Sequence, residues 1–251
     1  MVNLENKNLL GLPHEILSKN SAPESIVELR ASSNTINSID QRIANLLNLR
    51  HLDLSVNNLE YLPEQVECLS FLEYLDVSDN KIKEVVPAVW DLESLHILRF
   101  SRNHISHLSD HLGNLTNLRE LRFSKNRLLS IPEQITNLTN IEILDLSGNN
   151  LPEIPDLLPF TNLKVLCLAS NRLSNIPSLC KALLLEDLDL ESNNLECIPA
   201  MMSVYPNLTR INFAGLLPFL YCTNPLCDAI LALLRLIVLD LVLPRQQTST
   251  P

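Results

Sequence analysis

Apolar residues recur along this chain with a period of 23 residues, which shortens to 22 residues in two places. Nine segments superpose, and all but the last follow the pattern LxxLxLxxNxL, with other apolar residues allowed at the Leu positions. A fixed period of this length is typical of solenoids, in which each repeat packs against its neighbours. The segments begin at Ile26, Leu49, Leu72, Leu95, Leu118, Ile141, Leu163, Leu185 and Leu208.

The first half of each repeat alternates between apolar and outward-facing positions. The fourth and sixth residues are apolar, and this two-residue alternation predicts a short strand with one buried face. The fourth residues are Leu29, Leu52, Leu75, Leu98, Leu121, Leu144, Leu166, Leu188 and Ile211. The sixth residues are Ala31, Leu54, Val77, Phe100, Phe123, Leu146, Leu168, Leu190 and Phe213.

An asparagine follows three residues after the sixth position in eight repeats. An amide side chain can both donate to and accept from backbone groups, so we expect these residues to form a structural ladder at the bend that leaves the strand. A buried polar ladder requires such hydrogen bonds. Its members are Asn34, Asn57, Asn80, Asn103, Asn126, Asn149, Asn171 and Asn193.

The second half of each repeat has a helical spacing. In residues 62–69 (LPEQVECL) and 131–138 (IPEQITNL), apolar residues recur four and then three apart, and Pro63 and Pro132 suit the first turn of a short helix. Strands stacked about 4.8 Å apart would form a continuous parallel sheet, with the helical or 3₁₀ segments on the other side. The predicted fold is therefore an α/β solenoid with a concave strand face.

These motifs resemble those of the leucine-rich-repeat family, from Ile26 to about Phe213. The 23-residue form LPxxIxxL is similar to the intracellular subclass of Ras-suppressor and Scribble-type scaffolds. The resemblance implies recognition of a protein on the concave face, usually without catalysis. It also implies that related intracellular arrays can serve as phosphatase regulatory subunits.

The ends depart from the regular pattern. Residues 1–25 are predicted to be a degenerate N-terminal capping repeat and loop, followed by eight repeats over 26–207. Residues 208–243 are predicted to be an atypical last repeat with an apolar cap, and 244–251 a disordered tail. Residues 216–223 interrupt the last repeat before Asn224, as an insertion or an altered splice junction would.

The apolar stretch 226–243 admits three interpretations. A capping helix from Pro225 to about Leu239 would cover the open end of the solenoid, which is the interpretation we prefer. One more strand over 236–241 is an alternative, because this segment also fits LxxLxL. A membrane span is opposed by Asp228, Arg235 and Asp240, each of which would cost up to about 3 kcal/mol near the bilayer centre.

Composition and motif searches exclude several functions. The net charge of -10 opposes binding to nucleic acid, which needs clustered Lys and Arg. The four glycines form no phosphate-binding loop, and the sequence has neither HExxH nor GxSxG, so we expect no enzyme and no cofactor. His104, His107, Asp110 and His111 are near one another, but we expect solvated side chains there and no metal.

Two features predict a cytoplasmic location, with the nucleus as an alternative. The N-terminal residues show neither a basic segment nor a long apolar one, so we expect no secretory signal peptide. The six cysteines lack any framework spacing and are predicted to be free thiols in a reducing compartment.

Candidate binding residues lie at the outward positions of the strands. Repeats four and five bring several cations together, and acidic and apolar residues flank them. Such a patch would favour an acidic or phosphorylated partner, because Arg grips carboxylate and phosphate with two hydrogen bonds. The candidate residues are Tyr74, Asp76, Ile97, Arg99, Arg102, Arg122, Lys125, Arg127, Ile143 and Asp145.

We therefore expect a non-catalytic intracellular scaffold or adaptor that binds a protein on its concave face. One alternative is a regulatory subunit of a phosphatase or small-GTPase signalling complex. Another is a membrane-associated protein held by the C-terminal apolar segment. Finding an enzyme that co-purifies with the chain would favour the first alternative, and cell fractionation would test the second.

Overall fold

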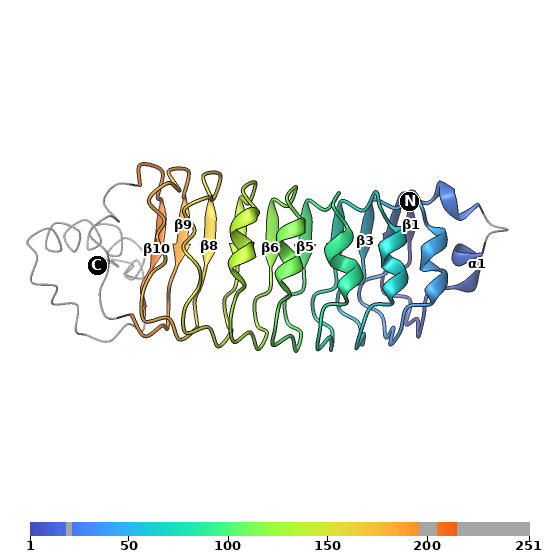
Figure 1. The fold of residues 1–251 in the computed structure, drawn as a ribbon. Coiled ribbons are helices and arrows are strands. Elements are labelled where there is room, and N and C mark those ends of the chain that lie inside the picture. Colours follow the sequence, from blue (N-terminus) through green and yellow to red (C-terminus); the bar gives the residue numbers. More distant parts are fainter. Residues whose placement is uncertain (19–21, 196–204, 215–251) are drawn as a thin grey trace, which may run out of the picture.

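A computed structural model describes residues 1–18, 22–195 and 205–214. Its ten strands form one sheet in which every strand runs parallel to its neighbours and the spatial order follows the chain (Figure 1). The predicted leucine-rich-repeat solenoid is confirmed. The strands are β1 (Val2–Asn3), β2 (Glu28–Arg30), β3 (His51–Asp53), β4 (Tyr74–Asp76), β5 (Ile97–Arg99), β6 (Glu120–Arg122), β7 (Ile143–Asp145), β8 (Val165–Cys167), β9 (Asp187–Asp189) and β10 (Arg210–Asn212).

Burial of one strand face sets the register of the sheet. The fourth-position residues lie opposite one another, as Leu75 does with Leu98, and both are almost fully buried. A slip of one residue would turn these side chains to solvent, so the hydrophobic pattern specifies the pairing. Phe100 and Phe123, each one residue beyond the end of its strand, stack with their ring centroids 5.3 Å apart. Each repeat therefore continues the core of the preceding one.

The asparagine ladder is a hydrogen-bond relay along the solenoid. Nδ2 of Asn103 donates to the carbonyls of Val77 and Phe100, each at 3.0 Å, and its Oδ1 accepts from the N–H of Ile82 at 2.9 Å. The Phe100 carbonyl also accepts from Nδ2 of Asn126, in the next repeat, at 2.9 Å. Neighbouring amides thus share carbonyl acceptors, which joins the bends of consecutive repeats.

The return segments are short, and most are 3₁₀ helices that lie opposite the sheet (Figure 1). Pro63 and Pro132 occupy the N-cap of their helices, one position before the expected first turn. The two 22-residue repeats have no helix between their strands, so the loss of one residue accompanies the loss of the 3₁₀ turns. The helical elements are α1 (His14–Leu17), η2 (Pro23–Ser25), η3 (Gln41–Asn45), η4 (Glu64–Cys68), η5 (Pro87–Asp91), η6 (Asp110–Asn114) and η7 (Glu133–Asn137).

The structure describes most of the N-terminal segment, and its description of the C-terminal end stops at residue 214. At the N-terminus, β1 adds a two-residue strand to β2, with Val2 opposite Leu29. The predictions for 216–223, 226–243 and 244–251 concern residues that lie outside the described ranges. Within the described residues, every helix is too short or too polar to cross a bilayer.

Candidate functional site

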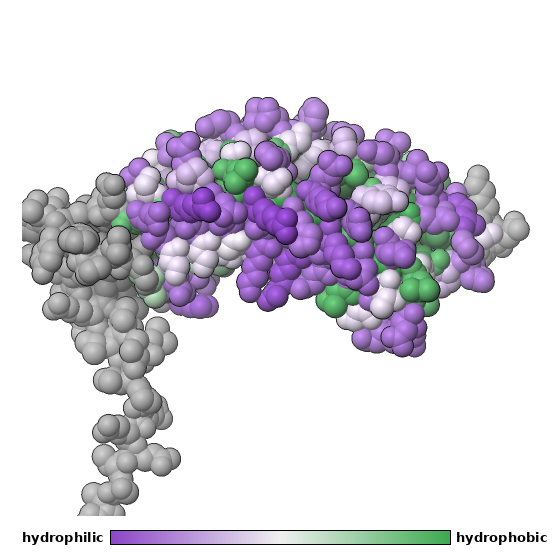
Figure 2. All heavy atoms as spheres, turned by 90° about the horizontal axis from the view of Figure 1, so that it is seen from below, coloured by the Kyte–Doolittle hydropathy of each residue, from purple (hydrophilic) through white to green (hydrophobic). Residues whose placement is uncertain are grey.

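The candidate binding residues on the strands lie on the concave face, at the centre of the array. The first and third residues of β4 to β7 turn away from the core, because the second residue of each strand is buried. Figure 2 shows the arch from one edge, with hydrophilic side chains gathered at the middle of its hollow side. Apolar side chains are more frequent towards the N-terminal end, on the right of that view.

Glu120 lies between two of the predicted cations. Its Oε1 accepts from Nε of Arg99 at 2.7 Å and from Nε of Arg122 at 2.5 Å. Glu120 is only 8% exposed. Burial raises the pKa of this carboxyl, but the hydrogen bonds from the two arginines outweigh burial and lower it. The carboxylate therefore holds both guanidinium groups in place.

The cluster extends towards the N-terminus through aromatic rings. Arg99 lies over the Tyr74 ring, 5.3 Å from its centroid, and its Nη1 donates to the Tyr74 hydroxyl at 3.0 Å. That hydroxyl donates to Oδ2 of Asp76 at 3.2 Å. His51, on the neighbouring strand β3, stacks on the Tyr74 ring, and the two ring centroids are 3.9 Å apart. Burial, followed by the charge of Asp76, raises the pKa of Tyr74 to about 12. We call Tyr74, Asp76, Arg99, Glu120 and Arg122 the central cluster.

The remaining predicted cations, Arg102, Lys125 and Arg127, do not extend the cluster into a continuous basic patch. Arg102 forms an ion pair with Asp79 at 3.7 Å, and Lys125 is exposed at the same position of the next repeat. Both have a positive φ of 54° at the bend after the strand. Arg127 follows Asn126, beyond the strand, and is exposed. The surface on which the sequence predicted several clustered cations is therefore an ion-paired cluster with further cations along one border.

The other candidate residues flank this cluster. Ile97 and Ile143 occupy the first position of their strands, on either side of Glu120. Asp145 stabilises its own bend, because its Oδ1 accepts from the N–H of Ser147 at 3.1 Å and from the Ser147 hydroxyl at 2.7 Å. Among the ten candidates, Ile97 and Ile143 thus offer aliphatic surface, whereas Asp145 contributes to local structure.

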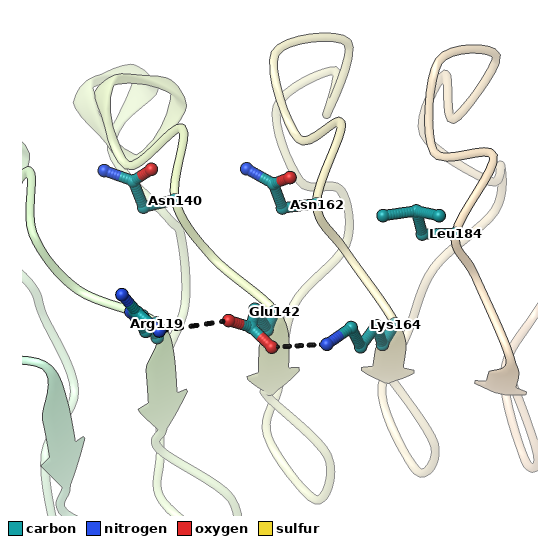
Figure 3. A pocket seen from close by; sticks show the side chains of 6 residues that line it. All are labelled: Arg119, Asn140, Glu142, Asn162, Lys164 and Leu184. Atoms are coloured by element: carbon teal, nitrogen blue, oxygen red, sulfur yellow. Dashed lines mark hydrogen bonds and ion pairs between the residues drawn. The ribbon is translucent and has the colours of Figure 1, made fainter.

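The sequence analysis missed Glu120, although it shares the third repeat position with Tyr74, Ile97 and Ile143. It also missed a second set of charges one residue earlier. Glu142 lies between Arg119, at 3.8 Å, and Lys164, at 2.7 Å (Figure 3). We call these three residues the rim triad. Reading the second and third positions as columns along the array would have found both sets.

Two adjoining hollows lie along this rim. One, of about 380 Å³, is lined by His96, Ile97, Arg119, Glu120, Glu142 and Ile143. The other, of about 250 Å³, is lined by Arg119, Asn140, Glu142, Asn162, Lys164 and Leu184, and Figure 3 shows its polar and apolar sides. Both hollows share Arg119 and Glu142. They are therefore parts of one groove across the strands.

The described residues offer surfaces for non-covalent binding. No three His, Cys, Asp or Glu side chains in these ranges are grouped closely enough to hold a metal ion. In the histidine-rich return segment, Nδ1 of His107 pairs with the Ser106 hydroxyl at 2.8 Å, and Nδ1 of His111 with the Ser109 hydroxyl at 3.3 Å. Burial, followed by the charge of Asp145, raises the pKa of the Cys167 thiol to about 12.

Solved structures with similar folds come from bacteria and plants. A leucine-rich-repeat protein of Leptospira interrogans matches with a TM-score of 0.77 and 28% identity, over 83% of this chain and 53% of that protein. Internalin C2 from Listeria monocytogenes matches with a TM-score of 0.67 and 24% identity, over 77% of this chain and 82% of the internalin. The plant peptide hormone receptor RGFR1, in complex with RGF2, matches with a TM-score of 0.65 and 24% identity, over 82% of this chain and 38% of the receptor chain.

The chain spans about half the length of the Leptospira protein. No curated protein matches its sequence. Two family descriptions do match: "Leucine-rich repeat region" over residues 26–124 and "Leucine Rich repeats (2 copies)" over residues 116–159. Together they cover more than half of the 251 residues, and the ten-stranded sheet has the same repeat architecture. The chain therefore belongs to the leucine-rich-repeat family.

Proposed function

We propose that this chain is a non-catalytic scaffold or adaptor that binds a protein partner through the central cluster and the bordering Arg102 and Lys125 on its concave face. Leucine-rich repeats are commonly protein-interaction modules. One similar structure, that of the receptor RGFR1, was solved in complex with RGF2. The repeated strands of such a fold supply a broad, rigid surface on which side chains can vary from repeat to repeat.

The observation that carries the proposal is the ordering of Arg99 before any partner binds. Glu120, Tyr74 and Asp76 all contact its side chain, by hydrogen bonds, ring stacking and an ion pair at 3.6 Å. A long side chain held in this way loses less conformational entropy on association, so more of its interaction energy contributes to affinity. Arginine and tyrosine are also frequent binding hot spots. The central cluster thus combines preorganisation with suitable chemistry.

Charge favours an acidic or phosphorylated segment as the partner. Arg102 and Lys125 border the central cluster at exposed positions, and Arg102 forms an ion pair with Asp79 at 3.7 Å. A partner carboxylate or phosphate placed between these cations would gain charge-assisted hydrogen bonds. In a chain whose net charge is -10, this border is a local exception that would orient an acidic partner.

Affinity capture followed by binding measurements with the purified partner tests the proposal. The variant Arg102→Glu/Lys125→Glu changes exposed side chains and leaves Glu120 paired, so the melting temperature should stay within a few degrees of the native value. Binding should weaken at least tenfold, as expected when two attractive charges become repulsive. The matched control, Lys83→Glu/Lys181→Glu, reverses two exposed charges outside the strands and should bind normally.

Equal binding by the native chain and the Arg102→Glu/Lys125→Glu variant would contradict the proposed surface. A phosphatase or small GTPase among the captured proteins would instead identify the chain as a regulatory subunit. We further propose a cytoplasmic location, supported by the free thiols of Cys68, Cys167 and Cys180. Imaging of the tagged chain and alkylation of its thiols in cells test this location, and a disulfide-bonded, secreted chain would contradict it.

A further inference from the structure

We propose that the groove along the N-terminal ends of β5 to β9 binds an extended peptide with two aliphatic residues four positions apart and an acidic residue midway between them. This inference rests on the proposed function and names the recognition chemistry of a second part of the concave face. The groove is distinct from the border of Arg102 and Lys125, which lies beyond the opposite ends of the strands. Binding to the two regions can therefore be separated by mutation.

The first contact is an aliphatic slot centred on β6. Ile97 and Ile143 line the 380 Å³ hollow from the strands on either side. Glu120, the residue between them, is hydrogen-bonded to Nε of Arg99 and Nε of Arg122, which are the third residues of their strands. Its Oε1 is thereby shared by the two arginines. A Leu, Ile or Val side chain of a partner would be removed from water by lying between the two isoleucines, which favours binding.

The second contact is the rim triad beside the slot. Arg119 and Lys164 flank the carboxylate of Glu142, and the negative charge of Glu186 also acts on Lys164. The side chains of Arg119 and Lys164 are 63% and 44% exposed, and the Arg119 pair is long at 3.8 Å. An acidic side chain entering between them would complete the pairing of both cations. Charge complementarity thus selects an acidic residue at this place.

The third contact is Leu184, which interrupts a row of amides. At the equivalent positions, Nδ2 of Asn117, Asn140 and Asn162 donates to a backbone carbonyl of the preceding repeat, at 2.9–3.3 Å. Leu184 has no such polar group and is 42% exposed, beside the exposed Leu183. Figure 3 shows its side chain at the end of the groove that Lys164 and Asn162 line. An aliphatic partner residue would cover it.

The spacing of the contacts defines the peptide pattern. Leu184 lies three strands from the centre of the slot, a sideways separation of about 14 Å. Four residues of an extended chain span about 13 Å, and alternate side chains point to the same side. An aliphatic residue in the slot, an acidic residue two positions along and a second aliphatic residue two further on would meet the three contacts. The pattern reads the same in both chain directions.

Selection from a displayed library of random 12-residue peptides, with the purified full chain as bait, tests this inference. Enriched peptides are then synthesised with a fluorescent label, and their Kd is measured by anisotropy. Leu184→Asn and Arg119→Gln/Lys164→Gln are the groove variants. Their matched controls are Leu129→Asn, which replaces another exposed leucine, and Lys83→Gln/Lys181→Gln, which removes two exposed charges outside the groove.

The expected result is enrichment of the aliphatic–x–acidic–x–aliphatic pattern. Each groove variant should weaken binding by about three- to tenfold, and the control variants by less than twofold. Melting temperatures of all variants should remain near the native value, because every substituted side chain is exposed or partly exposed.

Three outcomes would overturn the inference. Enriched peptides that lack the pattern, or that bind the groove variants as tightly as the native chain, show that the groove does not recognise this chemistry. If those peptides lose affinity for Arg102→Glu/Lys125→Glu instead, the proposed function stands and the groove assignment fails. If no peptide is enriched, the groove assignment also fails, while capture of a folded protein partner still tests the proposed function separately.

Discussion

Removal of a single amide from the asparagine ladder should destabilise the protein far more than removal of an exposed amide. Asn103 is 4% exposed, and the substitution Asn103→Ala removes four side-chain hydrogen bonds, the longest of which joins Nδ2 to the Ser101 carbonyl at 3.3 Å. The consequences for the partner groups differ. The carbonyls of Val77 and Phe100 keep one amide donor each, from Asn80 and Asn126, at 3.0 and 2.9 Å. The N–H of Ile82 loses the acceptor that Asn103 supplied.

The size of the effect follows from this difference. A buried donor left without a partner costs about 1–3 kcal/mol, and each carbonyl that loses one of two hydrogen bonds adds about 0.5 kcal/mol. The free energy of unfolding should therefore fall by about 2–4 kcal/mol. Asn103→Asp keeps the acceptor for Ile82 but removes both donors and places a negative charge beside two carbonyls. This variant should lose at least as much at neutral pH and regain part of it in acid.

Urea unfolding, followed by far-ultraviolet circular dichroism and by the fluorescence of Trp90, measures these losses. Trp90 is the single tryptophan of the chain and is buried in η5, so its emission reports on the same part of the solenoid. The matched control is Asn140→Ala, which removes one exposed hydrogen bond to the Thr116 carbonyl and should cost about 0.5 kcal/mol or less. If Asn103→Ala costs no more than this control, the relay does not stabilise the bends as reasoned.

Two other results are expected. Hydrogen bonds from Arg99 and Arg122 outweigh burial and lower the pKa of Glu120 in the folded chain. The stabilisation by this carboxylate should therefore be complete above its unfolded-state pKa of about 4.3. It should be lost as the pH falls through the lower folded-state pKa. Glu120→Gln should therefore cost about 1–2 kcal/mol near pH 7 and progressively less as the pH falls below 4, and a loss that does not change with pH would contradict this. At pH 8, Cys167, whose pKa is raised to about 12, should react with iodoacetamide much more slowly than exposed Cys180. Equal reaction rates, measured by mass spectrometry, would contradict the effect of burial and nearby carboxylates on the Cys167 thiol.

Much of the fold could be predicted from the apolar periodicity because a repeat has few ways to bury its leucines. The fourth and sixth positions must share one face of a strand, and this requirement specifies both the register and the parallel stacking. Return segments were less predictable. Residues 154–160 and 176–182 contain the same kinds of apolar residues as the helical returns, yet they form no 3₁₀ helix. The shorter repeat leaves fewer residues to complete the turns.

The candidate site was predictable only in part. Columns of residues along the array placed Arg99 and Arg122 on adjacent strands, where β5 and β6 pair them. The columns did not indicate that Glu120 would accept hydrogen bonds from both, because several carboxylates were within reach and the choice depends on side-chain conformation and burial. The Arg119–Glu142–Lys164 row likewise forms from residues that are 22 or 23 positions apart.

The sequence by itself determined the repeat, the buried columns and the amide ladder, since each follows from local spacing and from the need to satisfy backbone polar groups. Only the tertiary structure decided which charges pair, which apolar residues remain exposed and where the sheet is hollowed. The physical reason is that these features depend on contacts between repeats. Leu184 illustrates this, because its exposure becomes evident only when the amides of the neighbouring repeats are seen beside it.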